Sequence, residues 1–274
     1  MQLQQLNKIT QPFSATETMP LLFIGHGSPM NAIEQNEFAQ SWQETAKSLP
    51  KPSAVLCISA HWETKGTLIT AMEKPPTIHD FGGFPQALFD VEYAAPGSPQ
   101  LAITTAGLIT STEAKLDNGW GLDHGCWSVV KNMYPDADIP VIEMSMDYTQ
   151  TPQWHYQLAK DLSSLRQKGV LIIGSGNMVH NLRIMNWHSP DKGFDWADEA
   201  NAKLKKLILN NNHHQLINYN FIGAEMKLAV PTPEHYMPLL YILGLKKENE
   251  KVSFFTDKTT MGSISMTSVK IESE

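Results

Sequence analysis

Few cysteines, no excess of basic residues and no long apolar run set the first limits on this sequence. Its 274 residues include only two cysteines, Cys57 and Cys126, which are too few for a disulfide framework. The formal net charge of −7 argues against nucleic acid as a partner, because a polyanion requires a basic surface. No apolar run approaches the roughly 20 residues that cross a bilayer, and the polar first twenty residues lack the apolar segment of a signal peptide. We therefore expect a cytoplasmic protein that binds neither nucleic acid nor membrane.

The composition is that of an ordinary globular protein. Hydrophobic residues make up 42% of the chain and charged residues 18%, and the length suffices for one large core. Strand-like and helix-like segments alternate, which predicts an α/β fold of three layers, α/β/α, around a central mixed, mainly parallel sheet. We expect a flexible arm over residues 1–19 and a single catalytic α/β domain over residues 20–274. The oligomeric state stays open between monomer and homodimer.

Apolar runs and helical spacing predict the elements along the chain. Strands are expected at 20–25, 54–59, 67–72, 140–145 and 170–174, with edge strands after 251. Helices are expected at 34–48, 99–116, 126–133, 152–168, 193–211 and 213–219. Within 224–243, Tyr236, Leu239, Leu240 and Leu243 suit the face of a further helix. A long irregular stretch at 73–99 is rich in proline, glycine and aromatic residues. It is either a wall or lid of a pocket or a loop that only covers a sheet edge.

Three of the apolar runs are each followed within seven residues by a histidine: His26, His61 and His180. His124 and His235 lie in similar turns flanked by glycine or proline. Taken singly, each histidine can be a hydrogen-bonded polar residue at a sheet edge. Taken together, they predict a metal site on the rim of the sheet, and imidazole suits both zinc and ferrous iron.

Other motifs carry less weight. The turn at 174–177 does not complete Gly-x-Gly-x-x-Gly, because position 179 is valine, so no dinucleotide cofactor is expected. Ser28 lacks the Gly-x-Ser-x-Gly order of a nucleophile elbow. Cys126 as a catalytic thiol is the weaker interpretation, since both cysteines fit reduced, structural thiols.

Five ordered motifs carry a family resemblance over roughly residues 20–268. They are Gly25-His26-Gly27-Ser28-Pro29, Ser59-Ala60-His61-Trp62, Leu122-Asp123-His124-Gly125, Gly174-Ser175-Gly176-Asn177-Met178-Val179-His180-Asn181 and Pro233-Glu234-His235-Tyr236-Met237-Pro238-Leu239. The sequence resembles the class III extradiol ring-cleavage dioxygenases, and within them the 4,5-DOPA extradiol dioxygenase-like group. This resemblance implies an enzyme that opens a catechol ring beside its two hydroxyls with O₂ at a non-haem Fe(II) site.

The resemblance also implies roles for the histidines. His26 and His61 correspond to two metal ligands, and His235 to the last ligand. Relatives of the protocatechuate type have a glutamate there, and Glu234 is adjacent. His180 corresponds to an acid/base residue or a further ligand, and His124 to an acid/base residue near substrate and O₂.

An all-histidine site can equally hold Zn(II), so zinc is the alternative bound metal. We expect four further residues to contact the substrate: Gly27, Ser28, Trp62 and Phe81. Two other functions stay open. One is a zinc-dependent hydrolase with Glu234 as base, and the other is a catalytically silent protein that binds metal or an aromatic ligand.

Overall fold

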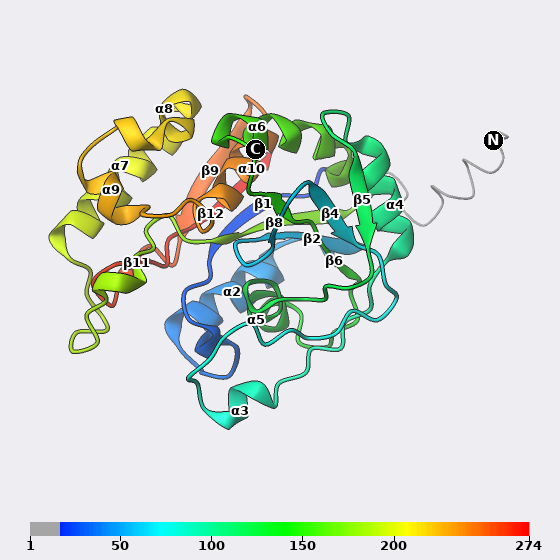
Figure 1. The fold of residues 1–274 in the computed structure, drawn as a ribbon, viewed down its shortest axis with the longest axis horizontal. Coiled ribbons are helices and arrows are strands. Elements are labelled where there is room, and N and C mark those ends of the chain that lie inside the picture. The colour runs from blue at the N-terminus through cyan, green and yellow to red at the C-terminus, as the bar shows by residue number, and fades with distance from the viewer. Residues whose placement is uncertain (1–16, 274) are drawn as a thin grey trace, which may run out of the picture.

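The computed structural model describes residues 17–273, and a six-stranded sheet lies at its centre (Figure 1). The strand order is β6-β2-β8-β1-β12-β9. The strands are β1 (Leu21–Gly25), β2 (Ala54–Ser59), β6 (Val141–Glu143), β8 (Val170–Gly176), β9 (Glu250–Phe255) and β12 (Ser268–Ser273). β6, β2, β8 and β1 run parallel, whereas β12 is antiparallel to both β1 and β9. The sheet is therefore mixed and mainly parallel, as predicted.

The two faces of the sheet are covered by different helices. Along β1, Leu22 and Ile24 share one core with α2 (Glu37–Ser48) and α5 (His124–Met133). Leu21 and Phe23 share the other core with α6 (Pro152–Ala159) and α10 (Met237–Leu245). Side chains alternate between the faces of a strand, so an uninterrupted apolar run fits a strand buried on both sides. The three-layer α/β/α prediction is confirmed, and Figure 1 shows α2 and α5 on the opposite side of the sheet from α6 and α10.

Shorter elements surround these layers. The other α-helices are α3 (Gln86–Phe89), α4 (Pro99–Leu108), α7 (Asp195–Leu209), α8 (His213–Ile217) and α9 (Glu225–Ala229). The 3-10 helices are η1 (Pro29–Ala32), η2 (Lys160–Lys168), η3 (Leu182–Ile184) and η4 (Tyr219–Phe221). Two-stranded ladders join β3 (Glu63–Thr64) to β7 (Met146–Asp147), β4 (Thr67–Thr70) to β5 (Ala114–Asp117), and β10 (Thr259–Thr260) to β11 (Ile264–Ser265). Within residues 17–273, no helix combines the length and apolar character needed to span a membrane.

Two helix predictions were wrong in extent. The helix predicted over 99–116 ends at Leu108, and its last residues form β5, which pairs in parallel with β4. Asp161 accepts hydrogen bonds from the backbone and hydroxyl of Thr110, which directs the chain away from the helix axis. The helix predicted over 152–168 becomes 3-10 from Lys160 and ends at the left-handed Gly169.

The flexible arm predicted over 1–19 lies mostly outside the described residues. At its end, Met19 is buried and exchanges backbone and side-chain hydrogen bonds with Arg166. Met19 therefore belongs to the folded body, and the predicted arm is too long at this end.

Candidate metal centre

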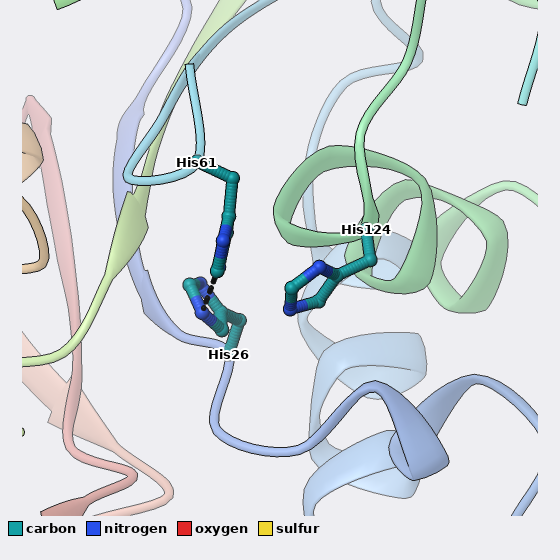
Figure 2. A group of neighbouring side chains, drawn as sticks. All are labelled: His26, His61 and His124. Atoms are coloured by element: carbon teal, nitrogen blue, oxygen red, sulfur yellow. Dashed lines mark hydrogen bonds between the residues drawn. The ribbon is translucent and has the colours of Figure 1, made fainter. Parts of the chain in front are cut away.

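The five histidines singled out in the sequence meet at the carboxyl edge of the parallel strands. His26 directly follows β1, His61 follows β2, and His180 follows β8. His124 is the first residue of α5, and His235 precedes α10. Ligand sites of open parallel sheets lie at this edge. Figure 2 shows three of these side chains, His26, His61 and His124, pointing toward one another from separate elements.

Three imidazoles are mutually close. The ring centroids of His26, His61 and His235 are separated by 5.0, 5.0 and 5.3 Å. His124 lies 3.8 Å from the ring of His61, and His180 stacks on His235 at 3.4 Å. The possible metal-ligating atoms form two groups. One group belongs to His26, His61 and His124, and the other to His180, Glu234 and His235.

The hydrogen bonds fix which ring nitrogen of His26 faces the centre. The Ser175 hydroxyl donates to the carbonyl of Gly125 at 2.5 Å, so it accepts from His26 Nδ1–H at 3.0 Å. His26 Nε2 is then unprotonated and lies 3.2 Å from Nε2 of His61. A partner that holds the Nδ1 proton and leaves Nε2 free is typical of metal-binding histidines.

The donor set fits a metal ion. Two nitrogens bound at about 2.1 Å to one tetrahedral ion lie about 3.4 Å apart, close to the 3.2 Å separation of the two Nε2 atoms. Burial lowers the pKa of His61 to about 3 and holds the pKa values of His26 and His235 well below the ordinary 6.5. The imidazoles are therefore neutral at pH 7, which is the form that binds metals.

Asp80 belongs to the site, although the sequence did not indicate it as a site residue. Its Oδ1 accepts the backbone N–H of His124 at 2.9 Å, and its Oδ2 accepts from His124 Nδ1 at 2.9 Å and lies 3.4 Å from His61 Nδ1. Burial raises the pKa of Asp80, but the hydrogen bonds from His124 outweigh it and keep that pKa below its ordinary value. The sequence signals were its place in the irregular stretch at 73–99 and the resemblance of Ile78-His79-Asp80-Phe81 to the family, and neither assigned Asp80 a role.

Glu234 and His235 occupy different places at the centre. The ring of His235 lies beside those of His26 and His61, whereas Glu234 Oε1 is 3.2 Å from His235 Nδ1 and accepts from the Thr232 hydroxyl. Glu234 thus orients the imidazole from behind, as Asp80 does for His124. A carboxylate engaged at Nδ1 is poorly placed to act as a hydrolytic base.

Gly176 makes room for the backbone of His235. A Cβ atom at Gly176 would lie 2.2 Å from the His235 carbonyl oxygen, which also accepts the N–H of Asn177 at 2.8 Å. The end of β8 therefore holds the His235 segment against the sheet. The glycine requirement at this position arises from the close approach of two backbones.

The residues expected to contact substrate have varied surroundings. Phe81 lies edge-on to His124 at 5.5 Å, and it belongs to the stretch at 73–99, which is anchored where Trp127 Nε1 donates to the Ile78 carbonyl. Gly27 adopts a left-handed φ of 60° in the turn beyond His26, and the Ser28 hydroxyl caps η1 at Met30.

Trp62 is buried and stacks in parallel on Trp120 at a centroid distance of 5.7 Å. Contact of Gly27, Ser28, Trp62 and Phe81 with substrate stays a prediction. Away from the centre, His155 and His213 hydrogen-bond to the hydroxyls of Tyr241 and Tyr156.

A buried cluster of histidines at the carboxyl edge of an α/β sheet fits a non-haem metal protein. Residues 20–271 match the family described as the catalytic LigB subunit of aromatic ring-opening dioxygenase. The chain belongs to this family, the class III extradiol dioxygenases, and is an aromatic ring-opening enzyme, as its motifs predicted.

Relatives and a solved structure agree with this assignment. An Escherichia coli protein named 4,5-DOPA dioxygenase extradiol is 47% identical over 92% of this chain and 94% of its own. A Beta vulgaris protein of the same name is 38% identical over 92% of this chain and 96% of its own. The crystal structure of an uncharacterized Escherichia coli K12 protein superposes with a TM-score of 0.81 at 41% identity, covering 93% of this chain and all of that chain.

Proposed function

We propose that this enzyme opens the ring of a catechol with a DOPA-like side chain, and that Fe(II) held by His26, His61 and His235 is the working metal. The observation that carries the proposal is the convergence of these three neutral imidazoles, with two Nε2 atoms 3.2 Å apart. The names of the relatives support DOPA as the first substrate to test. Zn(II) suits the same nitrogen donors and is the ion to exclude in a purified sample.

When bound, Fe(II) supplies a redox-active centre with positions at which both a catechol and O₂ bind. The chain supplies the groups that move protons. Burial lowers the pKa of His180 to about 4, so its imidazole is neutral at pH 7 and can accept a proton from a catechol hydroxyl. His180 lies face to face with His235, beside the proposed ligands.

His124 is the second proposed acid/base residue. Its Nδ1–H is bound to Asp80, so Nε2 is the atom that exchanges a proton with the substrate. The Asp80 carboxylate also stabilises the imidazolium that forms when His124 carries a second proton. The edge of Phe81 closes this side of the centre and helps to exclude water from the ring.

The test is oxygen uptake. Protein loaded anaerobically with Fe(II) is mixed with DOPA, caffeate or protocatechuate, air is admitted, and uptake is recorded together with a yellow product. We expect turnover with DOPA, and no uptake with any catechol would refute the proposal. Ester hydrolysis by the Zn(II) form without O₂ would instead favour the hydrolase alternative.

His61→Ala tests the ligand assignment. The variant is expected to lose most of its bound metal while keeping the circular dichroism spectrum of the wild type. His214→Ala, at an exposed position of α8, is the matched control and should retain metal and activity. Full metal content in His61→Ala would contradict the assignment.

The single domain, the cytoplasmic location and the choice between monomer and homodimer remain predictions.

A further inference from the structure

Two fully buried carboxyl groups, Asp123 and Glu143, lie directly behind the histidines. Asp123 caps the N-terminus of α5, and Glu143 is the last residue of β6. Both residues are 0% exposed, and the backbone N–H of Asp123 donates to Glu143 Oε1, so the two carboxyl groups are neighbours. Neither residue has a role in the proton transfers proposed above.

The hydrogen bonds leave one oxygen of each carboxyl without a donor. Glu143 Oε1 accepts the backbone N–H of Asp123 at 2.8 Å. Asp123 Oδ1 accepts from the Ser59 hydroxyl at 2.6 Å and from the backbone N–H of Cys126 at 3.1 Å. Asp123 Oδ2 and Glu143 Oε2 remain buried and unpaired.

The neighbouring titratable groups do not offset the negative charge that Asp123 and Glu143 would carry if both were ionised. The titratable groups that interact with the pair are Asp80, His124, Cys57 and Cys126, and none of them is a lysine or arginine. Two neighbouring carboxyl groups that are both fully buried do not both ionise, so one proton remains on the pair. Asp123 accepts two hydrogen bonds at a helix N-terminus, which favours the anion there, and Glu143 accepts one. The proton therefore belongs on Glu143. Burial raises the pKa of both carboxyls, and that of Glu143 well above its ordinary value.

We propose that Glu143 holds a proton that it donates to Asp123, and that this acid–anion pair is a positioning unit for His61 and His124. Asp123 holds Ser59, whose hydroxyl accepts the backbone N–H of His61 at 3.2 Å. As the cap of α5, Asp123 also fixes the first helical turn, which begins with His124.

The first turn of α5 is also linked by hydrogen bonds to a third histidine, His26. The Gly125 carbonyl accepts from Ser175, which in turn accepts from His26. A Cβ atom at Gly125 would lie 2.4 Å from the Ser59 oxygen, so helix and strand end are in close contact. The positioning role rests on the roles proposed for His61 and His124, whereas the shared proton does not.

Glu143→Gln and Glu143→Leu separate the proton from the side-chain volume. A glutamine amide can donate to Asp123 Oδ2 while its oxygen accepts the Asp123 N–H, so it reproduces the protonated acid. We expect Glu143→Gln to keep kcat and Zn(II) affinity, measured by chelator competition, within about threefold of the wild type. Glu143→Leu should lower both by about 10- to 100-fold, the usual loss for residues that orient metal ligands.

Glu250→Gln is the matched control. Glu250 is also buried, but it pairs with Arg166 at 2.5 Å and is ionised, so its amide leaves a buried guanidinium unpaired. We expect a lower Tm for Glu250→Gln and an unchanged Tm for Glu143→Gln. Infrared difference spectra at neutral pH should show the C=O stretch of a protonated carboxylic acid in the wild type and its loss in Glu143→Gln.

Each result decides one part of the proposal. Absence of that band in the wild type, or losses in Glu143→Gln equal to those in Glu143→Leu, would refute the shared proton. If Glu143→Leu does not fold, Ser59→Ala tests positioning: about tenfold weaker Zn(II) binding is expected with the infrared band retained. Unchanged Zn(II) affinity in Ser59→Ala would refute it. The infrared and Zn(II) measurements remain valid if no catechol is turned over.

Discussion

Replacing Asp80 by asparagine is expected to lower kcat by about 10- to 100-fold. Asp80 accepts two hydrogen bonds of 2.9 Å from His124, one from the backbone and one from Nδ1. Asparagine keeps one acceptor oxygen, so one of these bonds is lost or the imidazole changes tautomer. A hydrogen bond to a charged group contributes about 1.5–3 kcal/mol, and each 1.36 kcal/mol is a factor of about ten in rate.

The assay compares kcat and KM for oxygen uptake at saturating Fe(II), with Zn(II) affinity measured separately. Because Asp80 also lies 3.4 Å from His61 Nδ1, a smaller loss of metal affinity should accompany the fall in kcat. Asp138→Asn is the matched control, since Asp138 pairs with Lys51 at an exposed position. A kcat for Asp80→Asn within twofold of the wild type would refute the role of this carboxylate.

The remaining predictions concern the metal ligands and stability. His235→Ala should abolish detectable Zn(II) binding, whereas Glu234→Gln should weaken it only about tenfold; equal losses in the chelator assay would contradict this difference. Gly176→Ala should destabilise the fold by about 1–3 kcal/mol in urea unfolding, because its Cβ would meet the His235 carbonyl, and an unchanged midpoint would count against that close contact. Glu250→Gln should cost about 3–5 kcal/mol at pH 7. Burial raises the pKa of Glu250, but bonds from Arg166 outweigh this and hold it below 4.5. The stabilisation is therefore complete above pH 4.5 and is lost as pH falls through the folded-state value, so the two unfolding curves should converge in acid.

Much of the sheet and the identities of the clustered histidines followed from short-range patterns. The apolar runs ending at Gly25, Ser59 and Gly176 are buried on both faces and needed no long-range information to identify. The helix predicted over 99–116 failed because its end is fixed by Asp161, a residue distant in sequence. Local propensity contains no information about such a partner.

The different orientations of Glu234 and His235 could be seen only in the tertiary structure. The two residues are adjacent in sequence, and only the packing of their segment against Gly176 directs one ring toward His26. The roles of Asp80 and of the Asp123–Glu143 pair also could not be predicted from the sequence, because their hydrogen-bond partners lie 20 to 44 positions away.

The sequence by itself therefore determined the family, the α/β class and the five histidines, because strand-forming runs and their terminal residues are encoded contiguously. The tertiary structure decided how these histidines are oriented and which carboxyls hold them. Those properties depend on hydrogen bonds and burial that arise only when separate strand ends and the cap of α5 meet at one edge of the sheet.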